Sequence, residues 1–216
     1  MTRPVLIADD HPLFREALKQ ALQKVVGNAQ ILEASSVAEA QDVLKGHDVG
    51  LMLLDLHMDD SHGFTGLICI RQDRPALPVV VVSGSEDPQV VKRAIDFGAA
   101  GFIPKSSSLT VMSEALKAIM EDGDIWIPSY VDLDGDEGDE EESAAAKLAS
   151  LTPAQLKVLT CVVRGLLNKQ IAYEMDISEA TVKAHMTAIF RKLDVINRTQ
   201  AVLVAKDLDV VQDGMP

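Results

Sequence analysis

Cysteine is scarce in this sequence, which limits the kinds of covalent and metal sites that the chain can contain and the compartment that it suits. The only two cysteines, Cys69 and Cys161, lie far apart in the chain. Disulfide frameworks and zinc knuckles both require clustered cysteines, so this spacing excludes them. We therefore expect a protein of the reducing cytoplasm.

Long hydrophobic runs are also absent. No apolar stretch approaches the roughly 18 residues that a membrane-spanning helix requires. The first residues lead directly into a strand-like run, Val5–Ala8, without the pattern of a secretory leader. We expect no transmembrane helix and no membrane partner.

Basic side chains are missing from one part of the chain. Residues 121–142 carry eleven acidic side chains and no basic one, whereas residues 153–206 carry eight basic and four acidic side chains. The net charge of −13 at pH 7 would argue against nucleic-acid binding if it were spread evenly. Because it is segregated, the sequence indicates a mildly acidic body, a strongly acidic hinge and a basic tail domain that can bind nucleic acid.

Five short apolar runs divide the first 120 residues, and each has the length of a buried strand. They are Val5–Ala8, Ala29–Leu32, Leu51–Leu54, Val79–Val82 and Gly101–Ile103. Stretches with apolar residues at helical spacing separate these runs, and they begin near Leu13, Val37, Val90 and Leu109. Strands that alternate with helices predict an α/β fold with a five-stranded, doubly wound parallel sheet.

The hinge contains a block of like charges, Asp132–Glu142, which repels itself and predicts a solvated linker. A calcium-binding loop is the alternative, because aspartates alternate at the start of the block as its first ligands would. The remainder of that pattern is missing: Glu137 stands where the loop needs glycine, and Ser143 stands where it needs a closing glutamate.

The tail domain opens with strong helix-start signals. Thr152 can cap a helix, Pro153 suits the first helical position, and Gln155 completes a capping box. We expect this helix to run to Arg164 and to stop at Gly165.

Three more helices are expected in the tail domain. Asn168 can cap a short helix through Met175, and Ser178 can cap a longer one over residues 179–193. The last helix should span Thr199 to Leu208. Two helices joined by a tight turn have helix-turn-helix spacing, so the tail is predicted to be a small all-α domain of four helices.

Carboxylates follow the first and third predicted strands. Asp9 and Asp10 come after the first strand, and Asp55 comes after the third. Right-handed crossovers make these two strands neighbours, so three carboxylates should converge at one edge of the sheet. One aspartate after a strand is usually only a terminator, but three in one pocket are unfavourable without a cation. Hard oxygen ligands of this kind suit Mg²⁺.

Two more polar side chains follow the fourth and fifth predicted strands. Ser83 supplies a hydroxyl and Lys105 an ammonium group. Taken singly, the serine is more often a turn residue and the lysine a surface charge. Together with the carboxylates and a divalent ion they suit phosphoryl transfer to a carboxylate nucleophile, because the cations neutralise the developing oxygen charge.

This set of residues resembles the receiver domain of two-component response regulators, which has a flavodoxin-like fold. The resemblance implies that Asp55 accepts a phosphoryl group from a sensor histidine kinase and that Ser83 and Lys105 bind its oxygens. It also implies that Phe102 is the aromatic switch residue. The implied Mg²⁺ ligands are Asp10, Asp55 and the backbone carbonyl of His57, with Asp9 acting through water.

One departure from the receiver pattern bears on the pocket. Receivers usually carry proline where Asp59 stands, and we expect Asp59 and Asp60 to add two carboxylates near the pocket.

A rival class of protein also needs to be considered. Haloacid-dehalogenase-type phosphatases also use an aspartate nucleophile, but they need a second aspartate two residues later. His57 occupies that place, so the sequence disfavours an enzyme that hydrolyses external phosphate esters.

Residues 151–208 resemble the LuxR-type helix-turn-helix domain. The stretches that carry this resemblance are Leu151–Pro153, Gly165–Ala172, Ile177–His185, Phe190–Leu193 and Asn197–Ala201. A receiver followed by this domain is the architecture of NarL/FixJ response regulators, which implies a DNA-binding transcription factor. We expect a receiver domain over residues 1–122, an acidic linker over 123–150 and a LuxR-type DNA-binding domain over 151–210.

The third helix of the tail presents two different faces. One carries an apolar stripe that suits the core, and the opposite face carries small and basic side chains that suit the major groove of double-stranded DNA. The candidates for contact with bases or phosphates, with one from the preceding helix, are Lys169, Thr181, Lys183, Ala184, Thr187, Arg191 and Lys192.

The last helix contains more small apolar residues than a three-helix core needs. We expect Ala201, Val202 and Ala205 to pair two chains into a homodimer on DNA, because paired half-sites raise affinity and specificity.

Two other functions remain open at this stage: an adaptor whose tail only dimerises, and a receiver that acts without phosphorylation. The basic face of the third helix disfavours the first, and the complete acidic pocket disfavours the second. A further hypothesis is that the acidic hinge imitates DNA and occupies the basic helix in the resting protein.

Overall fold

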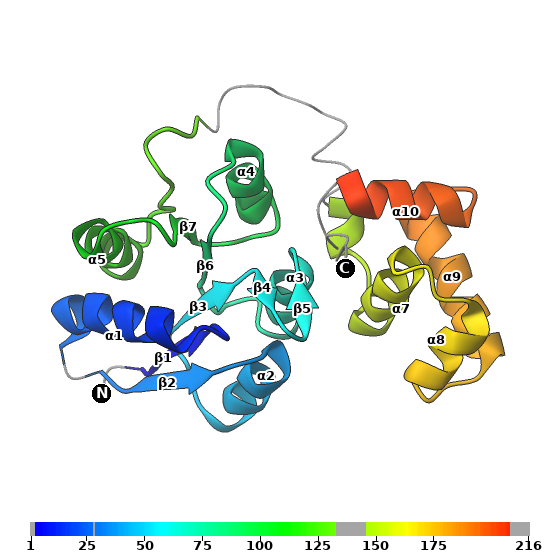
Figure 1. The fold of residues 1–216 in the computed structure, drawn as a ribbon, viewed down its shortest axis with the longest axis horizontal. Helices are drawn as coiled ribbons and strands as arrows, with labels where there is room; N and C mark the ends of the chain where they lie inside the picture. Colours follow the sequence, from blue (N-terminus) through cyan, green and yellow to red (C-terminus); the bar gives the residue numbers. More distant parts are fainter. Residues whose placement is uncertain (1–2, 28, 133–145, 208–216) are drawn as a thin grey trace. The chain divides into compact units, whose positions relative to one another are not determined.

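The computed structural model describes residues 3–27, 29–132 and 146–207. The chain divides into two compact units, Met1–Asp136 and Glu137–Pro216, and each is described here by itself (Figure 1). Among the described residues, no helix combines the length and the apolar character that crossing a membrane requires.

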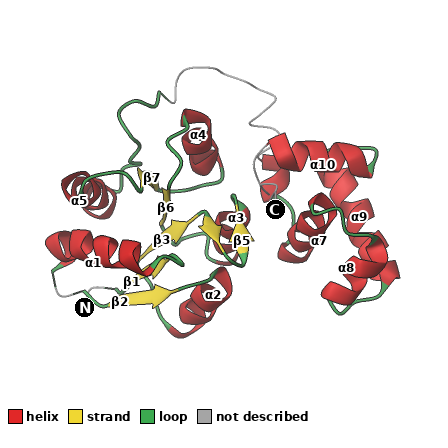
Figure 2. Cartoon of the chain, viewed as in Figure 1, coloured by secondary structure: helices red, strands yellow, loops and turns green. Residues whose placement is uncertain are grey.

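The first unit is built on a five-stranded parallel sheet with strand order β2-β1-β3-β6-β7. The strands are β1 (Val5–Ala8), β2 (Ile31–Ala34), β3 (Leu51–Asp55), β6 (Val79–Ser83) and β7 (Gly101–Pro104). The helices are α1 (Pro12–Val26), α2 (Val37–Gly46), α3 (Thr65–Asp73), α4 (Pro88–Asp96) and α5 (Leu109–Lys117) (Figure 2). The predicted doubly wound α/β fold is confirmed.

Helices cover both faces of the sheet, with α1 and α5 on one side and α2, α3 and α4 on the other (Figure 1). On the α1–α5 side, Ile7, Leu53 and Val82 of the central strands pack in one core cluster with Leu22 and Leu116 of the helices. Every residue of β1, β3, β6 and β7 is buried. Strands buried on both faces show no polar alternation, which is why they appear in the sequence as continuous apolar runs.

Three details of this unit differ from the sequence-based expectation. Strand β2 begins at Ile31 and not at Ala29. Helix α3 was not predicted, because Gly66–Ile70 are consecutively buried and leave no amphipathic period to detect. A small antiparallel hairpin of β4 (His57–Met58) and β5 (Ser61–His62) follows the third strand of the sheet.

Asp60, at the tip of this hairpin, caps helix α2. Its two carboxylate oxygens accept hydrogen bonds of 2.9 Å from the backbone N–H groups of Val37 and Ala38. A carboxylate at a helix N-terminus satisfies unpaired N–H groups and complements the helix dipole. The expectation that Asp60 adds a carboxylate to the pocket is therefore wrong, because both of its oxygens are directed at α2.

The segment after α5 belongs to the first unit. A π-helix, η1 (Ala118–Asp122), ends at Gly123, whose φ of 73° is left-handed. The chain then returns to the sheet, where Trp126 forms a parallel bridge with Gly101 of β7. The start that we predicted for the linker, residue 123, lies inside the first unit, and Trp126 packs on the core of that unit. The acidic residues 133–145, on which the calcium-loop and DNA-mimic hypotheses depend, lie outside the described residues.

The second unit is all-α, as predicted. Its helices are α7 (Pro153–Val163), α8 (Asn168–Glu174), α9 (Glu179–Leu193) and α10 (Arg198–Asp207). The predicted capping box is present: Gln155 N–H donates to Thr152 Oγ1 at 3.3 Å, and Thr152 N–H donates to Gln155 Oε1 at 3.0 Å. Residues 146–149 are also helical.

Two helix starts in this unit differ by one residue from the prediction. Asn168 is the first residue of α8 and not its cap; the cap position is Leu167, whose N–H donates to Gln170 Oε1 at 2.7 Å. Helix α10 starts at Arg198. The Arg198 guanidinium donates to the carbonyls of Val162 and Leu166, so it ties α10 to the C-terminal end of α7.

Replacing Asp60 by alanine should destabilise the receiver unit, because α2 loses the acceptor for two N–H groups. We expect a loss of about 1 kcal/mol in the free energy of unfolding. Urea denaturation followed by the emission of Trp126, the only tryptophan, reports on this unit. Asp59→Ala is the matched control, since Asp59 is an exposed neighbouring acid. Equal losses in the two variants would contradict the capping role.

Candidate functional site

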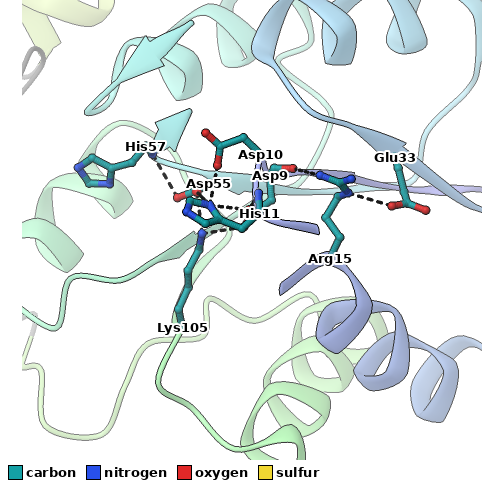
Figure 3. A network of polar contacts seen from close by, with 8 residues as sticks. All are labelled: Asp9, Asp10, His11, Arg15, Glu33, Asp55, His57 and Lys105. Atoms are coloured by element: carbon teal, nitrogen blue, oxygen red, sulfur yellow. Dashed lines mark hydrogen bonds and ion pairs between the residues drawn. The ribbon is translucent and has the colours of Figure 1, made fainter. Parts of the chain in front are cut away.

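Three carboxylates converge at the carboxyl ends of β1 and β3. These strands are direct neighbours, with Ala8 opposite Leu54, so Asp9 and Asp10 after β1 lie beside Asp55 at the end of β3. One ligand atom from each of Asp9, Asp10, His11 and Asp55 lies within 4.8 Å of the others (Figure 3). The sequence-based expectation of an acidic pocket at this edge agrees with this geometry.

Lys105 enters the same pocket from the strand end of β7. Its Nζ lies 2.7 Å from Asp55 Oδ2 and 2.8 Å from Asp9 Oδ2, and it also lies 4.9 Å from the centre of the Phe14 ring. Asp9 and Asp55 are almost completely buried. The ammonium group therefore neutralises two carboxylates that are largely shielded from water.

Burial governs the proton affinities in this pocket. It raises the pKa of the Asp55 carboxyl above its ordinary value, and the hydrogen bonds from Lys105 and the His57 backbone only partly oppose that effect. Burial, the largest single influence, would lower the pKa of Lys105, but the attraction of the Asp55 and Asp9 carboxylates together outweighs burial and leaves that pKa raised. The lysine is therefore held in its charged form.

His11 is a member of the site that sequence reasoning missed. Its Nδ1 lies 2.6 Å from Asp10 Oδ1, 3.2 Å from Asp9 Oδ1 and 3.8 Å from Asp55 Oδ2. Its backbone N–H donates to Asp9 Oδ1 at 2.7 Å. The available signal was its position directly after the aspartate pair, and a lone histidine there gives no indication of where its ring points.

Arg15 of α1 holds the loop that carries the aspartate pair. Its guanidinium donates to the backbone carbonyl of Asp9 at 2.6 Å and to Glu33 of β2 at 2.9 Å (Figure 3). The loop is therefore fixed between the first turn of α1 and the adjacent strand. Arg15 positions the carboxylates without contacting them.

An open cavity of about 550 Å³ lies at this site. Its lining consists of His11, Leu13, Phe14, Asp55, His57, Gly84 and Lys105. The backbone N–H of His57 donates to Asp55 Oδ1 at 3.1 Å, which places the start of the hairpin at the pocket. Ser83 and Phe102 are fully buried behind it, and Ser83 Oγ accepts a hydrogen bond from the Ser85 N–H at 3.2 Å.

The donor set fits a hard divalent cation. Asp9 Oδ2 and Asp10 Oδ1 are buried, and among the described residues no hydrogen-bond donor is aligned with either; they make ion-pair contacts with Lys105 and His11 respectively. Carboxylate oxygens that lack aligned donors and face one another are typical ligands of Mg²⁺. The residues present could therefore hold this ion.

In the second unit, α9 presents the two predicted faces. Val182, Met186, Ile189 and Leu193 are buried, whereas the opposite positions are exposed. The exposed candidates for DNA contact are Thr181, Lys183, Ala184, Thr187 and Arg191 on α9, with Lys169 at the start of α8. Their side chains form a small, basic surface at the helix-turn-helix.

The structure bears on two expectations for this unit. Lys192 Nζ donates to the Ser150 carbonyl at 2.6 Å and to Gln155 Oε1 at 2.9 Å, so it stabilises the start of α7 in this structure, and its contact with DNA stays a prediction. Ala201 and Ala205 are fully buried where α10 packs on α7 and α9, so they offer no surface to a second chain. Val202 is only partly buried, and Leu203 beside it is 53% exposed.

Both units match known families. Residues 5–117 match the response regulator receiver domain, and residues 149–205 match the bacterial regulatory proteins of the luxR family. The chain belongs to the NarL/FixJ family of response regulators. This regulator is similar over its whole length to the glycerol metabolism activator of Pseudomonas putida, with 43% identity over 95% of this chain and 96% of that protein.

Further relatives support the same assignment. The nitrate/nitrite response regulator protein NarP of Escherichia coli is 34% identical over 93% of each chain. Relatives of this kind are transcription-factor response regulators and not enzymes. Among solved structures, RcsB of Salmonella typhimurium has a TM-score of 0.57 at 23% identity and covers 95% of this chain and 98% of that chain, which shows the shared fold.

Mg²⁺ should stabilise the receiver unit against urea, and a chelator should remove that gain. At about one hundred times its dissociation constant a ligand adds about 2.7 kcal/mol to the free energy of unfolding. Asp55→Asn should be more stable than the parent in chelator, because one buried charge is gone, and should gain less from Mg²⁺. Asp48→Asn is the control, since Asp48 is exposed and pairs with Arg3. Equal gains in all three proteins would contradict a metal site here.

Proposed function

We propose that this regulator is a transcription factor activated by phosphorylation of Asp55 by a sensor histidine kinase with Mg²⁺. The observation that carries the proposal is the placement of the Asp55 carboxylate, which is buried at the floor of an open cavity with Lys105 Nζ at 2.7 Å. A nucleophile and a fixed cation at the end of a parallel strand suit transfer of a phosphoryl group.

In the proposed reaction, an Asp55 carboxylate oxygen attacks the phosphorus of a phosphohistidine. An O–P bond forms as the N–P bond to the histidine breaks, and the electron pair of that bond returns to the imidazole. Lys105 would hold one phosphoryl oxygen through its ammonium group. The transfer needs little covalent chemistry from the protein beyond positioning and charge neutralisation.

Mg²⁺, when bound, supplies positive charge that offsets the phosphoryl oxygens and the carboxylates. Asp10, Asp55 and the His57 carbonyl would hold it, with Asp9 acting through water. Asp9 also keeps Lys105 in place, because the same ammonium group bridges Asp9 and Asp55. His11 would have to give up its contact with Asp10 as the ion enters.

The output side of the pocket would use Ser83 and Phe102. Ser83 lies at the end of β6, and its hydroxyl would turn from the Ser85 N–H to a phosphoryl oxygen. Phe102 lies on the adjacent strand β7 and is fully buried, so it can change rotamer only if its neighbours move. Rearrangement of these two residues would transmit the phosphorylation of Asp55 to α4 and α5.

The second unit would bind promoter half-sites of double-stranded DNA as a dimer. Its basic face on α9 supports groove and phosphate contact through Lys183 and Arg191, and Lys169 at the start of α8 suits a phosphate. The exposed side of α10 around Val202 and Leu203 replaces the buried alanines as the proposed dimer surface. RcsB, which shares the fold, has been solved as two dimers bound to DNA.

Asp55→Asn should abolish labelling of the regulator by a small phosphodonor such as acetyl phosphate in the presence of Mg²⁺. The amide cannot act as a carboxylate nucleophile, so incorporation of phosphoryl groups should fall to background. Asp59→Asn is the matched control and should retain labelling. Persistent labelling of the Asp55 variant would identify another acceptor.

Binding to random-sequence duplex DNA should weaken steeply between about 50 and 200 mM salt, because counterions compete for the phosphates. Lys183→Gln and Arg191→Gln should each lower affinity and reduce the salt slope by about one. Lys157→Gln, on the exposed side of α7, should leave both quantities unchanged. Identical slopes in all four proteins would exclude this face of α9 as the phosphate-binding surface.

A further inference from the structure

Residues 124–131, which we name the strap, run along the outer edge of β7, where Trp126 forms one isolated parallel bridge with Gly101. The Phe102 N–H donates to the Trp126 carbonyl at 2.9 Å, and the Trp126 N–H approaches the Ala100 carbonyl at 3.4 Å. Trp126 also packs against the core cluster on the α1–α5 side of the sheet. The strap is therefore hydrogen-bonded to the backbone of the proposed switch residue.

Gly101 allows this close approach. A Cβ atom at position 101 would lie 2.9 Å from the Trp126 carbonyl oxygen and 2.8 Å from Ile119 Cδ1. The Ile119 contact is the end of a flexible side chain, but the Trp126 contact is backbone. Any larger residue at 101 would therefore force the backbone of the strap at Trp126 to shift away from β7.

The strap is held at few points. Pro128 and Val131 are buried, whereas Ile125 is 56% and Tyr130 52% exposed. Segments with few backbone hydrogen bonds and exposed apolar side chains open at low free-energy cost. The strap is thus a candidate for detachment while the sheet stays folded.

The loop after β6 is connected to the loop after β7. Glu86 of the first loop accepts a hydrogen bond of 2.6 Å from the hydroxyl of Ser106, the residue after Lys105. Glu86 is only three residues from Ser83, so the two sides of the pocket opening are joined close to the switch serine. Burial and the negative charge of Glu86 also raise the pKa of the Tyr130 phenol in the strap.

We propose that the strap is the element that transmits the state of Asp55 out of the receiver unit. Rearrangement of Ser83, the Glu86 loop and Phe102 on phosphorylation releases the strap from β7. The chain continues from the strap into the acidic segment that leads to the DNA-binding unit. Release lengthens this tether and frees the edge of β7. The inference rests on the proposed role of Asp55 as phosphoacceptor.

The alternative is that the strap is a permanently attached segment that only protects the edge of β7 from unwanted pairing. The two roles differ in one observable property. A permanently attached strap stays on β7 in both states of Asp55, whereas a transmitting strap leaves β7 when the pocket carries a phosphoryl group or its analogue.

The sole tryptophan of the chain lies in the strap and reports on it directly. The full-length regulator is titrated with Mg²⁺ and beryllofluoride, an analogue of the phosphoryl group, and Trp126 emission is followed. Hydrogen exchange of the Phe102 amide is measured in parallel, because this amide donates to Trp126. We expect emission to shift to longer wavelength and the Phe102 amide to lose protection. Neither change should occur in Asp55→Asn.

Gly101→Ala should reproduce the released state without beryllofluoride, with red-shifted emission and an unprotected Phe102 amide. It should still be labelled by acetyl phosphate, since Gly101 lies outside the pocket. Gly46→Ala, at the end of α2 with open space around it, is the matched control and should behave as the parent.

The outcomes separate the two proposals. Labelling of the parent with an unchanged Trp126 emission or a protected Phe102 amide overturns the transmitting strap and leaves Asp55 as the phosphoacceptor. Absence of labelling overturns the phosphoacceptor itself, and the role of the strap with it. Labelling together with both changes supports the transmitting strap.

Discussion

The ammonium group of Lys105 between Asp9 and Asp55 is the interaction on which the receiver unit depends. Two nearly inaccessible carboxylates lie at adjacent strand ends, and only one fixed positive charge bridges them. An unpaired buried carboxylate costs several kcal/mol, so the fold tolerates this edge of the sheet only because the lysine is there. The same crowding of charged groups favours binding of a further cation and of an anionic phosphoryl group, because each of them changes how charge is balanced among Asp9, Asp55 and Lys105.

The backbone around this interaction is organised to keep the carboxylates in place. Arg15 fixes the loop after β1, and the N–H of His57 holds one oxygen of Asp55. Parallel pairing in register brings β1 and β3 to the same level. The chemistry therefore follows from the topology: a doubly wound sheet places successive strand ends at one edge, and this sequence puts a charged residue at three of them.

Most of the fold could be predicted from the sequence because four of the sheet strands are fully buried and several helices, such as α7 and α9, are capped by recognisable residues. Helix α3 could not, because its buried run hides the helical period. Asp60 could not be assigned either, since the sequence does not show that the hairpin turns it toward α2. In both cases the outcome depends on tertiary packing, which the local sequence pattern does not show.

The site was predictable where the position at a strand end determines where a side chain points, as for Asp55 and Lys105. It was not predictable where a side chain has several reachable partners. His11 reaches the carboxylates, and Lys192 reaches the backbone of Ser150 just before α7. Ala201 suits a core and an interface equally well in sequence, and only the packing of α10 on its neighbours shows that it is core.

The cap that Asp60 places on α2 makes the pocket asymmetric. The hairpin that follows Asp55 is secured at its base by the His57 N–H and at its tip by the start of a helix. Ser83 and Lys105, on the other flank, are followed by loops joined mainly through one hydroxyl–carboxylate contact, between Ser106 and Glu86. The pocket is therefore held more rigidly on the side of β2 than on the side of β7, so a change at Asp55 moves the β7 side more easily. This difference in rigidity belongs to the receiver unit itself, so the side on which the structure responds is set before any partner binds.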